Sequence, residues 1–296
     1  MRRILITGGT GQVGTELLAC RWPSDVELVA PTRKEFDLSQ CDTIATYLSQ
    51  GAFDAVVNCG AYTAVDRAES DVLAAWKINA LAPAALAAAT KLAEIPLVHL
   101  STDYVFDGSK SGPYTEDDPV APLGVYGASK EAGEQAVRTG NPRHIILRTA
   151  WVFSPYGNNF VKTMLRLGKE KELIRVVADQ RGRPTAASDI AAVTRQVVIR
   201  LIEDVRAPVG TYHFVGEGDA TWYTFARELF ARQQLAGAKV PLVEPITTEQ
   251  YPTPARRPKN SSLSTTKLER DYGVKPRDWR TALEVVRNDL EANQIS

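Results

Sequence analysis

The sequence predicts a doubly wound α/β fold, in which a parallel sheet is covered by helices on both faces. Two observations predict it. Short apolar strands alternate with helical stretches through the first half of the chain, and a glycine-rich turn follows the first strand. Apolar strands of about five residues separated by helices imply right-handed crossovers and a sheet buried on both sides.

The expected elements follow one another in a regular order up to residue 149. The predicted strands are 4–7, 27–31, 55–58, 97–101 and 144–149, and an Ala-rich helical run covers 72–92. Further on the alternation becomes irregular, and helices are expected over 159–169, 187–204, 221–235 and 280–293. Prolines at 252, 254 and 258 indicate a long loop before the last elements.

Three glycines stand at the turn between the first strand and the first helix. Gly8, Gly11 and Gly14 allow a tight turn, and they let a pyrophosphate approach the N–H groups at the positive end of a helix. By itself the pattern also fits an ordinary strand-to-helix turn. Residues 58–63 and 101–104 follow later strands, so they are expected at the same edge of the sheet, where such folds bind ligands.

These features predict a division of the chain into two domains. We expect residues 1–150 to form a Rossmann-type dinucleotide-binding domain and residues 151–296 to form mainly a smaller, mixed substrate-binding domain. Segments near 174–207 are expected to return to the first domain. No internal repeat or low-complexity linker marks the boundary.

The composition excludes several classes of function. The 35 basic residues balance 35 acidic ones, so no net charge favours nucleic acid or an anionic membrane as a partner. The three cysteines and three histidines show no disulfide or metal-ligand spacing, which predicts a cytoplasmic protein without a metal site of its own. The first apolar run is three residues long, too short for a signal peptide or a membrane span.

Thr102, Tyr126 and Lys130 form the pattern that predicts chemistry. Tyr126 and Lys130 are four residues apart at the start of a predicted helix, which places them on one helix face, and Thr102 follows the fourth strand. Reduction of a carbonyl needs a hydride donor, a proton donor and a group that fixes the oxygen. A nearby ammonium lowers the pKa of a phenol from its usual value near 10, which favours proton transfer. The pattern therefore predicts reduction by a nicotinamide cofactor.

Longer motifs along the chain carry a family resemblance. They are 10–14 (TGQVG), 61–66 (AYTAVD), 101–106 (STDYVF), 125–127 (VYG), 148–152 (RTAWV), 157–160 (GNNF), 179–185 (DQRGRPT) and 251–255 (YPTPA). With these motifs the chain resembles the extended short-chain dehydrogenases/reductases, and more narrowly the dTDP-4-dehydrorhamnose reductases among them. The resemblance runs nearly end to end. It implies reduction of the C4 ketone of dTDP-4-dehydro-L-rhamnose to dTDP-L-rhamnose.

The resemblance also implies roles for particular residues. Tyr126 would donate the proton, Lys130 would support it and hold the nicotinamide ribose, and Thr102 would bind the substrate carbonyl. The implied contacts to the cofactor are Gly11, Gln12 and Val13 at the pyrophosphate, Asp37 and Leu38 at the adenine, and Ala61, Tyr62 and Thr63 at the ribose and nicotinamide; Gly8 opens the same turn. Asp103 and Trp151 would contact the sugar nucleotide. A turn-capping Asp103 and a core Trp151 are the alternatives.

Three arginines suggest phosphate contacts. No acid stands directly after the second strand, where Arg33 is found instead, which favours a cofactor with a 2′-phosphate; we expect NADPH, with NADH as a second cofactor. Arg256 and Arg257 lie in the proline-rich loop, and their planar guanidinium groups suit a diphosphate. In both places, solvated surface arginines are the alternative.

The sequence leaves magnesium and the oligomeric state open. Some members of the family dimerise around a magnesium ion held by glutamates. Glu16 is present here, but Ser188 stands where a glutamate would be expected. Both a monomer and a homodimer fit these residues.

Two other functions compete with the reductase. A sugar-nucleotide dehydratase would have a glutamate after Asp103, where this chain has Tyr104. A non-catalytic regulatory subunit of the methionine adenosyltransferase type would have no need of Tyr126 and Lys130. An epimerase or a reductase of another 4-keto sugar nucleotide also remains open.

Overall fold

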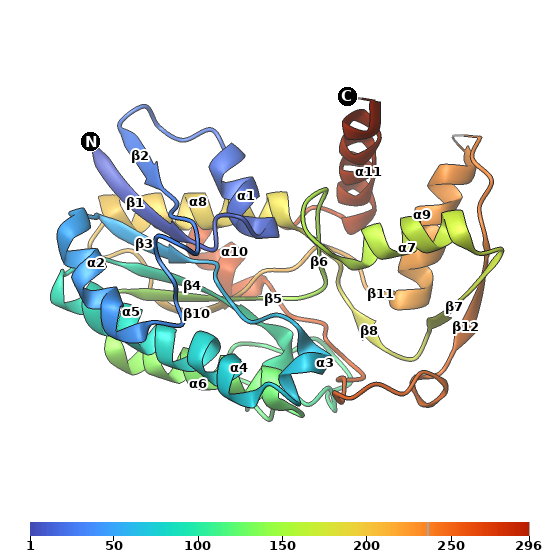
Figure 1. Cartoon of the computed structure of the whole chain (residues 1–296), viewed down its shortest axis with the longest axis horizontal. Coiled ribbons are helices and arrows are strands. Elements are labelled where there is room, and N and C mark those ends of the chain that lie inside the picture. Colours follow the sequence, from blue (N-terminus) through green and yellow to red (C-terminus); the bar gives the residue numbers. More distant parts are fainter. Residues whose placement is uncertain (236, 296) are drawn as a thin grey trace.

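The computed structural model describes residues 1–235 and 237–295 of the chain. Its centre is a six-stranded parallel sheet with the strand order β10-β5-β4-β3-β1-β2 (Figure 1). The strands are β1 Arg2–Thr7, β2 Val26–Val29, β3 Ala55–Asn58, β4 Leu97–Thr102, β5 His144–Thr149 and β10 Gly210–His213. Every residue of β3 and β5 is buried, as expected for a parallel sheet with both faces covered. The predicted doubly wound fold is therefore confirmed.

Helices cover the two faces of the sheet, and each layer has its own hydrophobic core. One layer holds α1 Gln12–Ala19, α8 Ala187–Glu203 and α10 Thr266–Tyr272; the other holds α2 Ile44–Gly51, α5 Ala82–Leu92 and α6 Val125–Gly140. Neither β10 nor α10 was expected from the sequence. Both are short, and their positions depend on packing against β5 and α8 rather than on a local pattern.

The Ala-rich run is one helical rod with a π-helical turn at its centre. It comprises α4 Val72–Trp76, the π-turn Lys77–Leu81 and α5. By length and composition alone, 72–92 is the one helix in the described part of the chain that could cross a membrane. Core helices of soluble proteins also pass this test. Here Ala82, Leu86 and Ala87 are buried in the core that covers one face of the sheet.

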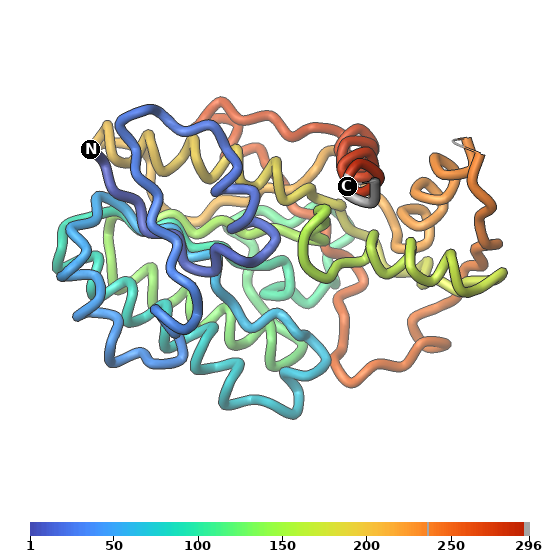
Figure 2. The backbone as a smooth tube through the Cα atoms, turned by 45° about the horizontal axis from the view of Figure 1, so that its top comes forward, coloured from blue at the N-terminus to red at the C-terminus, as the bar shows by residue number. Residues whose placement is uncertain are grey.

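A second group of elements lies at one end of the sheet, and we call it the outer lobe. Its elements are α7 Phe160–Glu170, β7 Leu173–Val177, α9 Trp222–Leu235, β12 Leu242–Ile246 and α11 Trp279–Ile295. β7 pairs in parallel with β12, and the helices share a core built around Phe225 and Trp279. Figure 2 shows that the chain passes between this lobe and the main sheet several times.

Short strands connect the outer lobe to the main sheet. β6 Val152–Phe153 pairs with β9 Thr185–Ala186, and β8 Arg181–Gly182 pairs with β11 Ala220–Thr221. Of the segments expected near 174–207, α8 packs against α1 beside the main sheet, whereas β7 lies in the outer lobe.

Candidate active site

The turn after β1 forms a cradle at the start of α1. Gly8 has φ +69°, and a Cβ there would lie 2.7 Å from the backbone nitrogen of Gly60. A Cβ on Gly14 would lie 2.2 Å from the carbonyl oxygen of Gly8. Gly11 is the N-cap of α1 and has no side chain to fill the space in front of the first N–H groups. The cradle therefore suits an anion such as a pyrophosphate.

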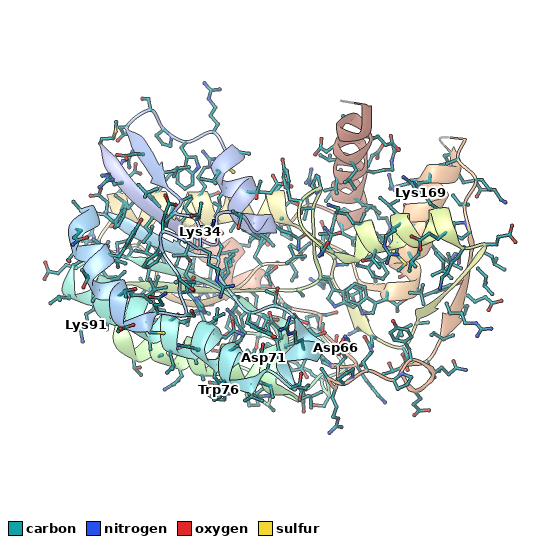
Figure 3. The ribbon with its side chains drawn as sticks, viewed as in Figure 1. Lys34, Asp66, Asp71, Trp76, Lys91 and Lys169 are labelled. Atoms are coloured by element: carbon teal, nitrogen blue, oxygen red, sulfur yellow. The ribbon has the colours of Figure 1, made fainter. Side chains whose placement is uncertain are left out.

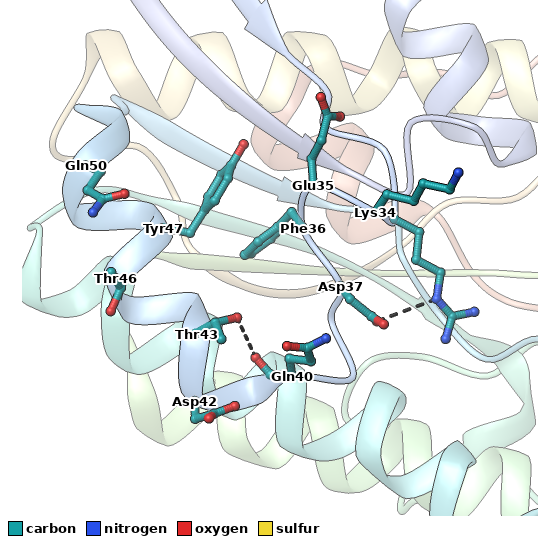
Figure 4. A pocket seen from close by; sticks show the side chains of 11 residues that line it. Lys34, Glu35, Phe36, Asp37, Gln40, Asp42, Thr43, Thr46, Tyr47 and Gln50 are labelled. Carbon is teal, nitrogen blue, oxygen red and sulfur yellow. Dashed lines mark hydrogen bonds and ion pairs between the residues drawn. The ribbon is translucent and has the colours of Figure 1, made fainter.

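A pocket of about 180 Å³ lies over this turn and collects predicted cofactor-binding residues. It is lined by Thr7, Gly8, Gly9, Thr10, Pro31, Arg33, Phe36, Asp37, Leu38, Gly60, Ala61 and Ile78. A larger open pocket of about 840 Å³ adjoins it and is drawn in Figure 4. Arg33 and Asp37 line both pockets, and their side chains form an ion pair of 3.6 Å. The Arg33 side chain is 76% exposed, so it is accessible to a phosphate on a ligand.

Gln12 and Val13 face different surroundings. The Oε1 of Gln12 accepts hydrogen bonds from Ser154 Oγ and Asn159 Nδ2, both at 2.9 Å, and so joins α1 to the segment before α7. Val13 is buried in the core between α1 and the sheet. Their backbone N–H groups stand at the start of α1, where they are available for the predicted pyrophosphate contact.

The loop that holds Ala61, Tyr62 and Thr63 is fixed by a residue that the sequence analysis missed. Asn79, in the π-turn, accepts a hydrogen bond from the Tyr62 N–H at 2.8 Å and donates to the Tyr62 carbonyl at 3.0 Å. It also donates to Ser129 Oγ on α6 at 3.1 Å. An asparagine buried inside an apolar, Ala-rich helix is the pattern that could have identified it.

Thr102, Asp103 and Tyr126 lie together at the end of β4 and the first turn of α6. The Thr102 hydroxyl donates to Asp103 Oδ1 at 3.0 Å and is also a hydrogen-bond partner of the Tyr126 phenol. The edge of the Tyr104 ring packs against Tyr126 with ring centroids 5.4 Å apart. Gly127 allows this approach, because a Cβ there would lie 2.1 Å from the Tyr104 carbonyl oxygen.

Burial shifts the pKa of each of these groups. It raises the pKa of Tyr126 to about 12, with a smaller contribution from the charge of Asp103, while the hydrogen bond to Thr102 acts in the opposite direction. It also raises the pKa of Asp103 to about 6, against hydrogen bonds from Ser261 and Thr102. The Oδ2 of Asp103 is buried without a hydrogen-bond partner.

The expected lowering of the Tyr126 pKa by Lys130 is not found. The Lys130 ammonium group is directed elsewhere: Nζ donates to the Leu100 carbonyl at 2.7 Å and lies 3.3 Å from His99 Nε2. Burial lowers the pKa of Lys130 to about 8, although the charges of Glu134 and Cys59 oppose the shift. The Tyr126 phenol is therefore protonated at neutral pH, which is the form that a proton donor requires.

Trp151 is partly buried, packs against two hydrophobic cores and has an unusual backbone conformation. Its φ is +48°, a left-handed conformation that costs a bulky residue free energy and is often found at functional sites. Its ring stacks on Trp222 with centroids 3.6 Å apart, and Trp222 Nε1 donates to Gln180 Oε1 at 3.1 Å. Sequence analysis did not single out Trp222 or assign a role to Gln180.

A pocket of about 870 Å³ extends from Trp222 into the outer lobe. Its lining includes the aromatic rings of Phe160, Trp222 and Tyr251 and the guanidinium groups of Arg166, Arg175 and Arg257. Rings and guanidinium groups together suit a planar base linked to phosphates.

The two arginines of the C-terminal loop differ. Arg257 lines this pocket and forms an ion pair of 2.8 Å with Asp66 on α3 Val65–Ala68, a residue labelled in Figure 3. Arg256 is exposed and is not part of the pocket lining.

Glu16 lies near two other carboxylates. Burial raises its pKa, and the charges of Asp289 and Asp189 add to the shift. Asp189 is bound by Arg277 at 2.8 Å. Among the residues that the structure describes, no group of three potential ligands has the geometry to hold a metal ion.

Fold and site together define a class of protein. A doubly wound sheet with a glycine cradle on β1, and a Tyr and a Lys one turn apart on the helix after β4, are typical of the extended short-chain dehydrogenases/reductases. Residues 1–292 match the family described as RmlD substrate binding domain.

Named proteins agree with this match. A dTDP-4-dehydrorhamnose reductase from Aggregatibacter actinomycetemcomitans is 44% identical over 97% of this chain and 99% of its own length. The crystal structure of a dTDP-4-dehydrorhamnose reductase from Clostridium acetobutylicum superposes with a TM-score of 0.91 at 40% identity, covering 98% of this chain and 99% of the other. The enzyme of that name from Bacillus anthracis, in complex with NADP, gives 0.89 at 35% identity, over 98% and 100%. The chain belongs to the dTDP-4-dehydrorhamnose reductase family.

Proposed function

We propose that this protein reduces the C4 ketone of dTDP-4-dehydro-L-rhamnose to dTDP-L-rhamnose with NADPH. The observation that carries the proposal is the position of Tyr126. Its phenol is hydrogen-bonded to Thr102 at the sheet edge that also holds the glycine cradle. Arg257, which interacts with the neighbouring Tyr104, lines the outer-lobe pocket. Relatives with 40–44% identity carry the corresponding name.

The glycine cradle and its pocket fit a dinucleotide. The N-terminus of α1 would bind the pyrophosphate, and Arg33 would contact a 2′-phosphate. Asp37 and Leu38 would lie at the adenine, and the loop from Ala61 to Thr63 at the nicotinamide side. NADPH, when bound, supplies the hydride.

The residues of this chain supply the proton. The Tyr126 O–H bond breaks as the proton moves to the carbonyl oxygen of the substrate, and the electron pair stays on the phenolate. The Thr102 hydroxyl, which donates to Asp103 Oδ1 in the free protein, would turn to donate to the same carbonyl oxygen and so hold it near the phenol. Asp103, Trp151 and Arg257 would bind the sugar nucleotide, with Arg257 at the diphosphate.

NADPH oxidation against a panel of 4-keto-6-deoxy sugar nucleotides tests the proposal. We expect turnover with dTDP-4-dehydro-L-rhamnose and slower turnover with NADH. Faster turnover of another sugar nucleotide would identify that compound as the substrate. Formation of an epimer or a dehydrated product without NADPH consumption would contradict the proposed reductase activity. Binding of all ligands without any turnover would favour a regulatory subunit.

We further propose a dinucleotide-binding domain of residues 1–150, to which segments near 174–207 return, and a mainly substrate-binding domain of residues 151–296. We also propose a cytoplasmic protein without nucleic-acid or membrane partners. The free cysteines support the cytoplasmic location, and the zero formal charge supports the absence of nucleic-acid and membrane partners. The carboxylates near Glu16 are compatible with both a monomer and a homodimer. Measuring the molecular mass with and without magnesium distinguishes these states and tests whether the ion has a role.

A further inference from the structure

A row of buried polar side chains crosses the sheet beneath α6. Thr7, Asn58 and His99 are register partners on the neighbouring strands β1, β3 and β4. The row ends at Lys130 on α6, and all four side chains are at most 2% exposed. Because they are buried, their donors and acceptors are expected to pair with one another or with nearby backbone groups.

The orientation of the Asn58 amide follows from its neighbours. Its Oδ1 lies 2.6 Å from Thr7 Oγ1 and 3.2 Å from the backbone nitrogen of Gly60. A backbone N–H can only donate, so the oxygen must stand on this side. The Nδ2 group therefore faces His99 Nδ1, at 2.9 Å, and donates to it.

The same reasoning assigns the tautomer of His99. Its Nδ1 accepts from Asn58, so a neutral ring carries its proton on Nε2. The ring is neutral because burial lowers the pKa of His99 well below its usual value. The Nε2–H group points at Lys130 Nζ, 3.3 Å away.

An ammonium has no lone pair and cannot accept this hydrogen bond, whereas an amine can. As an amine, Nζ satisfies both neighbours, because it accepts from His99 and donates to the Leu100 carbonyl at 2.7 Å. The charged or titratable groups that act on Lys130 from α6 and from the end of β3 are Glu134 and Cys59, and both favour the ammonium. The row of hydrogen bonds has the opposite effect and favours the amine form of Lys130.

We propose that His99 is a positioning residue for Lys130, holding Nζ against the Leu100 carbonyl in the amine form through the Nε2–H bond. This inference rests on the proposed function and extends it. Lys130 then gains and loses its proton with a midpoint near pH 8. The loop after β3 is coupled to that proton through Gly60 and Asn58.

Nitrogen-15 NMR of the free protein tests the inference without any assay of activity, so its outcome is independent of the proposed reaction. The chain has three histidines, and His99→Phe assigns the signals of this ring. At pH 10 we expect the proton of His99 on Nε2. The ring shifts should then move with a midpoint near pH 8 as Lys130 is protonated, a value that follows from its lowered pKa. In Lys130→Met this titration should be absent.

Asn58→Asp provides a second test with a defined direction. A carboxylate can only accept, so the His99 proton must move to Nδ1 and Nε2 must present its lone pair to an ammonium. The midpoint should rise by a pH unit or more, and the pH profile of kcat/KM should shift with it. Asn141→Asp is the matched control, because Asn141 is also buried but bonds to Thr90 and Ile95 instead.

Two results would overturn the inference. One is a His99 proton on Nδ1 at pH 10 in the unaltered protein. The other is a set of ring shifts that stays constant from pH 6 to pH 10. If both NMR predictions hold and no sugar nucleotide is reduced, the proposed function fails while the assignment of His99 stands.

Discussion

The carboxyl edge of the main sheet and the outer lobe contribute to the site in different ways. At the sheet edge, Thr102 and Tyr126 are placed by a strand end and by the first turn of a long helix. Where the outer lobe joins the main sheet, Trp151 stands directly before the two-residue strand β6, and Arg257 lies in the C-terminal loop. Groups that react are thus held by regular backbone, whereas groups suited to recognition depend on packing between distant segments.

The two regions also differ in burial. Lys130 and Asp103 at the sheet edge are at most 2% exposed, while Arg166 and Arg175, which line the outer-lobe pocket, are exposed. Burial shifts pKa values and makes a substitution costly, whereas exposed charges are screened by solvent. Substitutions at the sheet edge should therefore change rate and pH dependence, and those at arginines should change binding.

The largest expected effect is that of Tyr126→Phe. Removing the phenol proton should lower kcat by roughly 10²–10⁴-fold, the usual contribution of general acid catalysis. Binding of NADPH and of dTDP should stay within a factor of two, measured by calorimetry. Tyr114→Phe is the control, since its buried hydroxyl bonds to Asp107 instead. A variant that keeps half of the original kcat would remove Tyr126 from the mechanism.

Lys130→Met should change the pH dependence of stability. The pKa of Lys130 is lowered from 10.5 to about 8 in the folded protein, so the unfolded chain binds more protons between these values. The unaltered protein should therefore gain stability as pH rises from 8 to 10.5, by about 3 kcal/mol from this group.

The Met variant should lack this gain. Urea unfolding of both proteins at several pH values from 7 to 10.5 gives the difference, and groups common to both cancel. Parallel stability curves would mean that Lys130 titrates with an ordinary pKa.

The comparison also explains which parts could be predicted from sequence. β1, β3, β4 and β5 were predicted because a buried parallel strand reads as a continuous apolar run. The position of Tyr126 followed from its place after such a strand. In the outer lobe only the helices were predicted, because its strands β7 and β12 are only partly buried and pair with each other from distant parts of the chain. The connecting strands β6 and β8 consist of two residues each and also form by pairing with distant segments.

Side chains that support the site were the hardest to predict. Trp222 acts through Gln180, 42 residues away, which no local pattern reveals. Asn79 stands out as a polar residue in an apolar helix, but its partner Tyr62, 17 residues away, could not be predicted. The direction of the Tyr126 pKa was also wrong in the sequence analysis. The spacing of Tyr126 and Lys130 is correct, but it could not show that Nζ points to Leu100 and His99.

Arg257→Ala and Arg256→Ala compare two neighbouring positions of the C-terminal loop. Arg257 lines the 870 Å³ pocket, so its loss should weaken dTDP binding by roughly 1.5–3 kcal/mol, or about 10- to 150-fold. Arg256→Ala should leave dTDP binding unchanged. Calorimetric titration of dTDP into both variants, with NADPH titrated as a reference, measures this. Equal affinities in the two variants would place the diphosphate away from Arg257.

The smallest expected effect is that of Arg33→Ala. The guanidinium is largely exposed and its ion pair with Asp37 is 3.6 Å long, so solvent screens its contact with a 2′-phosphate. The KM for NADPH should rise about fivefold, on the order of 1 kcal/mol, while the KM for NADH stays the same. Lys34→Ala is the control from the same loop. Because only NADPH carries the extra phosphate, an equal rise for both cofactors would mean that Arg33 supports the loop and does not bind the phosphate.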